Sequence, residues 1–221
     1  MKKNSNHTSL EEGEPAWDAE RLLAAKRLLS EEEYLNLDGN YFVEFSQGRI
    51  DLLPSPTTSH QRLLACLYEL LAAVNVRKKL GVVLIGPLPV RLGPGEFREP
   101  DILFVLRQHY DLMGERFWTG ADLVMEIVSP GAKSRRRDLK EKRRDYAKAG
   151  IPEYWVVDQR QVTITVLRLV GESYSVHGEF ARGEIATSHL LPGFTVDVTA
   201  AFDTQKPEGV KPTKAKRRPK A

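Results

Sequence analysis

The alternation of hydrophobic and polar positions predicts a chain built largely of short strands. Clear strand patterns, bounded by Gly, Pro, Asn, Asp or Ser, cover 41–45, 49–53, 81–85, 88–92, 101–106, 122–128, 153–157 and 162–169. Weaker strand patterns cover 174–176 and 194–198. Most consecutive strands can pair as hairpins, which favours a sheet with many antiparallel neighbours.

Helical spacing of the apolar residues predicts three helices between these strands. They cover 17–36, 60–79 and 134–149. Ser30 and Glu33 form a capping box within the first, and Thr58 or Ser59 is the expected N-cap of the second. The third is basic and lies between two apolar strands, so strand, helix and strand should give one parallel pair with a right-handed crossover. The sequence therefore predicts an α/β (α+β) fold, a mixed β-sheet flanked by helices.

Composition is consistent with one globular domain that has polar ends. Of the 221 residues, 41% are hydrophobic and 29% charged, and no apolar run approaches the roughly 20 residues that a membrane helix needs. A single cysteine, Cys66, excludes an internal disulfide framework and a cysteine-based zinc site. We expect a flexible N-terminus over 1–16, one domain over 17–203, a basic disordered tail over 204–221, and a cytoplasmic location without a membrane anchor.

Three polar residues interrupt patterns that otherwise indicate a buried core. Asp101 opens one apolar strand, Glu126 lies inside another, and Lys142 lies in the basic helix. A buried acid is costly unless a cation pairs with it, so such interruptions mark candidate sites. If the strands 101–106 and 122–128 pair as a hairpin, Asp101 comes close to Glu126.

The basic helix can bring its lysine to the same point. Asp138, Lys142 and Tyr146 are four residues apart and share one stripe, which Tyr146 should turn toward the sheet. Two carboxylates and a lysine suit phosphodiester hydrolysis with Mg²⁺, because carboxylates bind this ion and a lysine can stabilise charge on phosphate. The alternatives are strand-end acids that pair with arginines such as Arg98, and a solvated lysine.

Three strings in this order resemble one known family. They are REPDILFV (Arg98–Val105), DLVMEIVSP (Asp122–Pro130) and DLKEKRRDYAKAGIPEYWVVD (Asp138–Asp158), with EFSQGRIDLLPSPTTSH (Glu44–His60) upstream. They resemble the Uma-two family of restriction endonucleases, which belongs to the PD-(D/E)XK nuclease superfamily. The resemblance spans about 30–200. It implies a restriction-endonuclease-like fold and a DNA endonuclease that uses Mg²⁺, with Mn²⁺ as a substitute.

The resemblance assigns roles to individual residues. Pro100 and Asp101 match the PD pair and Glu126 matches the D/E, so these two acids and the Ile127 carbonyl are implied as the metal ligands. The usual lysine position holds Val128, and the resemblance implies that Lys142 on the following helix replaces it. Glu44 matches an upstream acid that assists metal binding or orients the lysine; the alternative is an acid on an exposed strand face.

A run of basic residues follows the proposed site. The candidate DNA contacts are His60, Lys133, Arg135, Arg136 and Arg137. The alternatives are a solvated charged helix face and, for His60, a helix-start residue without a site role. No base-reading motif is present, so the sequence predicts no target sequence.

The predicted function is a metal-dependent endonuclease that hydrolyses phosphodiester bonds in DNA. A homodimer is plausible, because cutting both strands needs two active sites. A catalytically inactive nuclease fold that binds DNA or a protein is the first alternative, and Val128 at the usual lysine position keeps it open. The second alternative is an unrelated α/β structural protein without affinity for metal or DNA.

Overall fold

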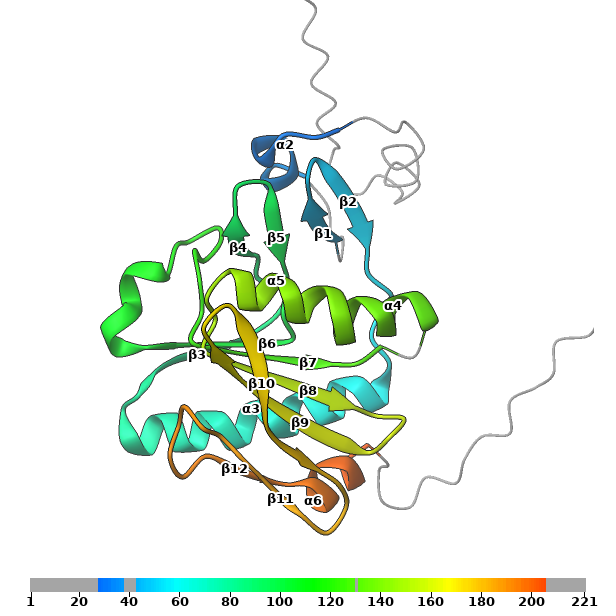
Figure 1. Ribbon diagram of the computed structural model, residues 1–221, viewed down its shortest axis with the longest axis vertical. Coiled ribbons are helices and arrows are strands. Elements are labelled where there is room, and N and C mark those ends of the chain that lie inside the picture. Colours follow the sequence, from blue (N-terminus) through cyan, green and yellow to red (C-terminus); the bar gives the residue numbers. More distant parts are fainter. Residues whose placement is uncertain (1–27, 38–42, 130, 206–221) are drawn as a thin grey trace, which may run out of the picture.

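The computed structural model describes residues 28–37, 43–129 and 131–205 (Figure 1). The expected N-terminal segment 1–16, the helical pattern as far as residue 27 and the tail from residue 206 lie outside these ranges. Across the described ranges, we find no helix with the length and apolar character that crossing a membrane requires.

A six-stranded mixed sheet forms the centre of the fold. Its strands in spatial order are β10 (Ser173–Phe180), β9 (Thr163–Val170), β8 (Glu153–Asp158), β7 (Leu123–Ile127), β6 (Ile102–Leu106) and β3 (Gly81–Ile85). β7 and β8 are parallel, and the other neighbouring strands of this sheet pair antiparallel. The predicted mixed sheet with a parallel pair around the basic helix is confirmed.

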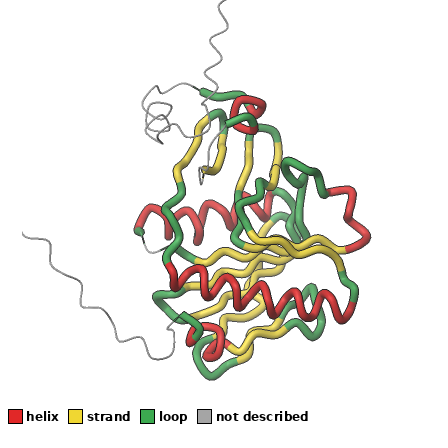
Figure 2. The backbone as a smooth tube through the Cα atoms, turned by 180° about the vertical axis from the view of Figure 1, so that it is seen from behind, coloured by secondary structure: helices red, strands yellow, loops and turns green. Residues whose placement is uncertain are grey.

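Helices cover both faces of this sheet, as Figures 1 and 2 show from opposite sides. One face carries α3 (Thr58–Lys78), the ribbon of β11 (Ile185–Thr187) and β12 (Thr195–Asp197), and α6 (Val198–Asp203). The other face carries one continuous helix made of α4 (Ala132–Arg136), a π-helical turn (Arg137–Glu141) and α5 (Lys142–Lys148). This second helix is the basic helix that the sequence predicts.

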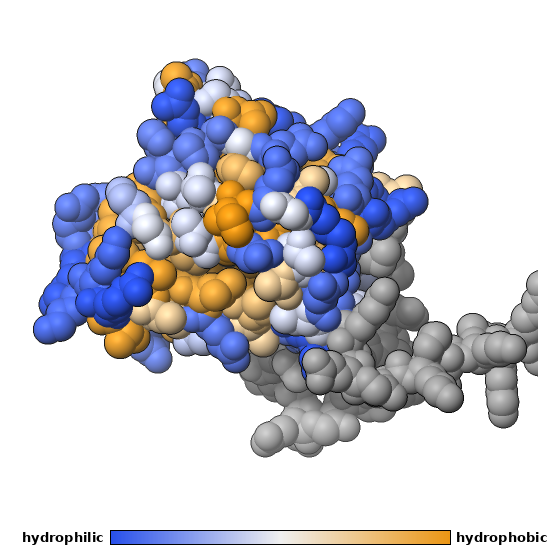
Figure 3. Space-filling view, turned by 90° about the horizontal axis from the view of Figure 1, so that it is seen from below, coloured by the Kyte–Doolittle hydropathy of each residue, from blue (hydrophilic) through white to orange (hydrophobic). Residues whose placement is uncertain are grey.

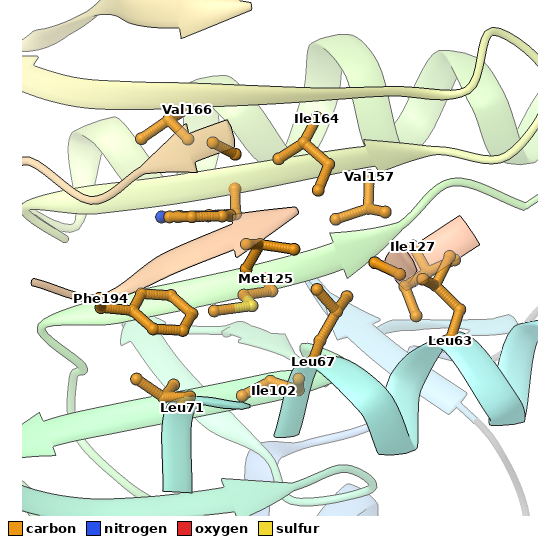
Figure 4. Close-up of a cluster of buried hydrophobic side chains, with 14 of the residues drawn as sticks. Leu63, Leu67, Leu71, Ile102, Met125, Ile127, Val157, Ile164, Val166 and Phe194 are labelled. Carbon is orange, nitrogen blue, oxygen red and sulfur yellow. The ribbon is translucent and has the colours of Figure 1, made fainter. Parts of the chain in front are cut away.

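Alternation along β7 decides which side chains meet which helix. Met125 and Ile127 pack with Leu67 of α3 in the larger apolar core, where all three are buried (Figure 4). Val124 belongs to the core on the opposite face. Because successive side chains of a strand point to opposite faces, Glu126 lies on the α5 side of the sheet.

A smaller antiparallel sheet packs beside the central one. Its strands in spatial order are β2 (Arg49–Leu52), β1 (Val43–Ser46), β5 (Glu96–Arg98) and β4 (Val90–Gly93). Tyr34 of α2 (Glu31–Leu35) stacks on Phe45 of β1 with ring centroids 4.9 Å apart. The capping box predicted at Ser30 is confirmed, since Ser30 and Glu33 exchange side-chain to backbone hydrogen bonds at the start of α2.

Strand partners differ from the hairpins that the sequence suggests. The strand predicted at 88–92 is β4, which pairs with β5, a three-residue strand too short to give a clear pattern. The strand at 81–85 is β3, and it pairs with β6 at the edge of the central sheet. Gly81 permits this approach, because a Cβ there would lie 1.8 Å from the carbonyl oxygen of Val105.

Side-chain caps set two element boundaries differently from the prediction. The N-cap of α3 is Thr57, not Thr58 or Ser59, because its Oγ1 accepts a hydrogen bond from the backbone N–H of His60. The predicted strand 194–198 ends early, because the Asp197 side chain caps α6. The apolar pattern cannot distinguish such a short strand from the first turn of a helix.

At one end of the β6–β7 pair the two strands are connected, and at the other end lie the two acids that the sequence singles out. The connection between the strands starts with a 3₁₀ segment, η1 (Arg107–Leu112), and joins the end of β6 to the start of β7. The opposite ends carry Asp101, just before β6, and Glu126, near the end of β7. The acids that the sequence singles out therefore lie at the end away from this connection.

Seen from below, the face that carries β11, β12 and α6 is largely polar, with apolar residues gathered near its middle (Figure 3). Large apolar side chains that are exposed in this part of the fold include Val76 of α3 and Ile185 of β11. The candidate site lies on the other side of the central sheet, beside α5.

Candidate active site

The register of β6 and β7 brings the two predicted acids together. Ile102 pairs with Met125, so the next position outward sets Asp101 opposite Glu126. Both acids line a pocket of about 870 Å³, its open mouth included, and the wall of this pocket also contains His60, Ile127, Asp138 and Lys142. Ser129 and Arg137 are also in its wall, so the pocket lies where β7 leads into the basic helix.

Asp101 is held at the rim of the pocket by two contacts. Its Oδ2 accepts a hydrogen bond of 2.7 Å from the backbone N–H of Ile127, and its Oδ1 lies 3.4 Å from Nε2 of His60. The N–H and C=O of one strand residue point to the same side. The Ile127 carbonyl therefore faces the Asp101 side of the strand. Arg98, which could have paired with Asp101, pairs with Asp145 at 2.7 Å instead.

Glu126 and Lys142 form a buried, hydrogen-bonded pair. Lys142 Nζ lies 2.7 Å from Glu126 Oε1, and Tyr146 Oη donates a second hydrogen bond of 2.6 Å to the same oxygen. Glu126 and Lys142 are 4% and 2% exposed, so this lysine is not a solvated cation. The predicted stripe along the basic helix is confirmed, because Asp138, Lys142 and Tyr146 are all buried against the sheet.

Glu44 reaches this pair from the smaller sheet. It lies on β1, is buried, and its Oε1 is 2.8 Å from Lys142 Nζ. Its other oxygen lies 3.7 Å from Nε of Arg137. Of the two roles left open for Glu44, orienting the lysine has a direct contact, and an exposed strand face is excluded by the burial.

Sequence reasoning gave no site role to two further acids, Asp138 and Glu99. Asp138 Oδ1 lies 3.9 Å from Lys142 Nζ, and Oδ2 accepts a hydrogen bond from the backbone N–H of Ser129. Glu99 lines the pocket and accepts a hydrogen bond of 3.4 Å from the Tyr34 hydroxyl. The available signals were the place of Asp138 one turn before Lys142 and that of Glu99 next to the Pro-Asp pair.

The predicted DNA contacts do not share one surface. His60 and Arg137 line the pocket, and the Arg137 side chain is only 11% exposed. Arg135 makes a bidentate pair with Asp158, while Arg136 is 75% exposed and pairs with Glu141. The side chain of Lys133 lies outside what the structure describes. The basic run therefore divides between buried, paired and exposed cations, because several of its members find acids on other elements.

Comparisons with known proteins identify the family and the fold of this chain. The sequence profile of the Uma2 family, described as "Putative restriction endonuclease", matches residues 31–199. The chain belongs to this family. A solved structure described as a "putative nuclease belonging to DUF820" from Anabaena variabilis has a TM-score of 0.65 and 16% identity, over 80% of this chain and 99% of that chain. At that identity the likeness supports the fold alone. No curated protein matches the sequence.

Uma2 membership confirms the resemblance seen in the motifs and supports a nuclease activity in general terms. The predicted mixed β-sheet flanked by helices is likewise confirmed, and the Anabaena structure shares this fold.

Carboxyl groups outnumber cations in the candidate active site of this Uma2 protein. The acids are Glu44, Glu99, Asp101, Glu126 and Asp138, and the permanent cations in contact with them are Arg137 and Lys142. Burial raises the pKa of Glu126 to about 8 against the attraction of Lys142, and the charges of Asp101, Asp138 and Glu44 add to the rise. Burial, followed by the charge of Glu44, raises the pKa of Glu99 to about 7. Without a further cation, the site therefore retains protons on its acids at neutral pH.

Besides Arg137, the basic side chains Lys142 and His60 of the site stay protonated more readily than usual. Burial lowers the pKa of Lys142, but the charges of Glu126 and Glu44 outweigh it and the net shift is upward. Burial also lowers the pKa of His60, and the hydrogen bond with Asp101 and its charge reverse that effect to a net rise. Both side chains therefore partly compensate the excess of acids.

The donor set suits a magnesium ion that keeps most of its water. Within the described residues, no group of three or more His, Cys, Asp and Glu side chains could hold a metal ion by itself. Mg²⁺ commonly binds through one or two carboxylates and retains several waters. Asp101 and Glu126 provide the two carboxylates, and the Ile127 carbonyl provides a third oxygen. The excess of acids over cations in the pocket also favours the binding of a divalent cation.

We expect the stability of the metal-free protein to fall as pH rises from about 6 to 8. Between its ordinary pKa of 4.5 and its folded value of about 8, Glu126 keeps a proton in the folded chain that the unfolded chain has lost. The folded state then binds more protons than the unfolded one, so each pH unit costs up to about 1.4 kcal/mol for such a group. Denaturant unfolding with a chelator, at several pH values, measures this slope.

The matched variant for this pH dependence is Glu126→Gln, which cannot titrate. Its unfolding free energy should depend less steeply on pH than that of the wild type. Equal slopes for both proteins would contradict the assignment of the retained proton to Glu126.

Proposed function

We propose that this chain is a divalent-metal-dependent endonuclease that hydrolyses phosphodiester bonds in DNA. The observation that carries the proposal is the convergence of Asp101 and Glu126 at adjacent strand ends, beside the buried ammonium of Lys142. Mg²⁺ is the proposed ion and Mn²⁺ its substitute, since both prefer oxygen ligands. Uma2 membership supports the nuclease class, and the donor set supports the choice of ion.

The proposed ligands of the ion are Asp101, Glu126 and the Ile127 carbonyl. A bound Mg²⁺ supplies a more acidic water and neutralises charge on the phosphate. Asp101 is pre-oriented by the Ile127 N–H, and Glu126 by its two donors on the basic helix. This leaves little side-chain freedom to lose when the substrate binds, which is the general advantage of a preorganised site.

Lys142 is proposed to stabilise charge on the scissile phosphate or to orient the attacking water. Glu126 and Glu44 hold its ammonium between them at 2.7 and 2.8 Å. Because burial weakens the screening by water, a fixed positive charge acts strongly on an anionic transition state. Glu44 is proposed to orient Lys142 and to bind no metal, because its contacts are with Lys142, Arg137 and the backbone N–H of Glu99.

His60 and Arg137 are proposed to contact the substrate phosphate inside the pocket. His60 lines the pocket with its Nε2 3.4 Å from Oδ1 of Asp101, so its ring lies beside the proposed ion. The guanidinium of Arg137 has donors suited to a phosphate, as Arg generally does. Arg135, Arg136 and Lys133 are proposed as outer contacts to the DNA backbone, and the Arg136 side chain is more exposed than that of Arg135.

We further propose a cytoplasmic location and a homodimer for this nuclease. A cytoplasmic enzyme would meet DNA directly. A homodimer would bring one site to each strand of a duplex and so allow double-strand cleavage. Both remain proposals, to be checked by fractionation of cells and by light scattering of the purified full chain.

Cleavage of supercoiled plasmid DNA tests the proposed activity. The full-length protein is incubated with Mg²⁺, Mn²⁺ or a chelator, and parallel reactions contain single-stranded DNA and RNA. We expect nicked or linear plasmid with either ion and intact plasmid with the chelator. Cleavage of RNA alone, or cleavage that persists in the chelator, would overturn the proposal.

A binding assay on the same samples separates the alternatives. DNA binding that needs no divalent ion, without cleavage under any condition, would indicate an inactive nuclease fold, the reading that Val128 suggests. Absence of both DNA binding and calorimetric metal binding would indicate a structural protein. Either result rejects the endonuclease.

A further inference from the structure

Tyr146 places a buried hydroxyl at the heart of the candidate site. Its side chain is fully buried, and its ring meets that of Tyr154 edge-on with centroids 5.2 Å apart. Its Oη donates a hydrogen bond of 2.6 Å to Oε1 of Glu126. The sequence pattern explains the ring, which belongs on the face of the helix that packs against the sheet, but not the hydroxyl.

The hydroxyl shares its acceptor with the lysine of the site. Lys142 and Tyr146 lie one turn apart on α5, and both donate to the same oxygen of Glu126, at 2.7 and 2.6 Å. The π-helical turn comes just before them, with the Lys142 N–H bonded to the carbonyl of Arg137. After this turn, α5 continues with ordinary spacing, so residues i and i+4 present their polar ends side by side.

Two donors on one oxygen fix a carboxylate more firmly than one does. With Lys142 alone, the Glu126 carboxylate could rotate about the single contact and exchange its two oxygens. With both donors, Oε1 is held by two hydrogen bonds from α5. Among the described residues, the side chains that donate to Glu126 all donate to Oε1. Oε2 is then the oxygen that remains for a ligand in the pocket that Glu126 lines.

We infer that Tyr146 is a positioning residue of the nuclease site, whose hydroxyl holds the Glu126 carboxylate in the orientation that binds the divalent ion. The inference rests on the proposed function. It goes beyond packing, because the ring alone would satisfy the apolar contacts with Tyr154. Partners that orient a metal-binding carboxylate typically contribute about tenfold to a hundredfold to metal affinity.

The test compares Tyr146→Phe with Tyr174→Phe. The first variant keeps the ring and removes only the hydroxyl that bonds to Glu126. The second removes another buried hydroxyl, which donates to the carbonyl of Ile151 at 2.7 Å, away from the site acids. Mn²⁺ affinity of the full-length proteins is measured by calorimetry, well below the Tm of each variant, and cleavage is measured as a function of Mn²⁺ concentration.

We expect Tyr146→Phe to bind Mn²⁺ about tenfold to a hundredfold more weakly. Its cleavage rate should recover in large part at saturating Mn²⁺, whereas Tyr174→Phe should match the wild type in both measurements. Wild-type Mn²⁺ affinity in Tyr146→Phe would overturn the inference, and so would equal losses in the two variants, which would indicate packing. A wild-type protein that binds no Mn²⁺ would instead reject the proposed function itself.

Discussion

Replacement of Glu126 by glutamine is expected to abolish divalent-ion binding and cleavage while leaving the fold about as stable as the wild type at pH 7. Burial raises the pKa of Glu126 to about 8, so in the metal-free protein this group carries a proton at pH 7. Glutamine reproduces that neutral form, and its amide oxygen can still accept from Lys142 and Tyr146. It cannot supply the negative charge that the ion requires, so cleavage should fall by about a thousandfold or more.

Three measurements on one preparation check this expectation. Calorimetry with Mn²⁺ reports binding, plasmid cleavage reports activity, and thermal unfolding reports stability. The control is Glu69→Gln, which makes the same change at an exposed position of α3. Undiminished cleavage by Glu126→Gln would exclude Glu126 from the reaction. A large loss of Tm in the same variant would show instead that its charge supports the fold.

Replacement of Lys142 by methionine should cost both activity and stability. Methionine has a similar length but no charge, so the Glu44 carboxylate loses the ammonium that lies 2.8 Å from it, and the protonated Glu126 loses a hydrogen bond of 2.7 Å. Removing one partner of a buried ion pair typically costs about 3–5 kcal/mol, because the other charge stays buried without compensation. Cleavage should fall below detection, since the proposed stabilisation of the phosphate is lost as well.

The same helix supplies the control for Lys142. Lys140 is exposed two residues earlier, and Lys140→Met should change the free energy of unfolding by less than about 0.5 kcal/mol. The double variant Lys142→Met with Glu44→Gln should regain part of the lost stability but no cleavage, which separates the two roles of the lysine. Equal stabilities of Lys142→Met and Lys140→Met in denaturant unfolding would contradict the buried pair.

The sequence carried enough information to find the centre of the site. Asp101 and Glu126 stand out as acids in apolar strands, and the hairpin between these strands brings them together without knowledge of the rest of the fold. Lys142 follows from four-residue spacing along a helix that must face the sheet. These inferences use periodicity and neighbours along the chain, and such signals are local.

What the sequence could not give depends on contacts between distant elements. Glu44 meets Lys142 only because the smaller sheet packs beside the basic helix, a contact that no local pattern encodes. The basic run looked like one DNA-binding face, yet Arg135 pairs with Asp158 of β8 and Arg137 turns inward to Glu44. Pairing partners of this kind decide whether a cation is available to DNA, and they can be known only after the fold.

The sequence pattern also failed to predict two short elements, because contacts with other elements stabilise them more than their own residues do. β5 has three residues, and its pairing with β1 and β4 outweighs its weak intrinsic signal. The π-helical turn also leaves no mark in the spacing of apolar residues, although it lies just ahead of Lys142.

The antiparallel course of β6 and β7 also provides a convenient place to attach the molecule to a surface. The connection through η1 leaves both strands at the ends farthest from the acids, and five residues at about 3.3 Å each separate it from them by roughly 16 Å. Glu115, exposed on this connection, is therefore a suitable point for a dye or an immobilising linker. A protein tethered there would keep its pocket open to long polymeric substrates.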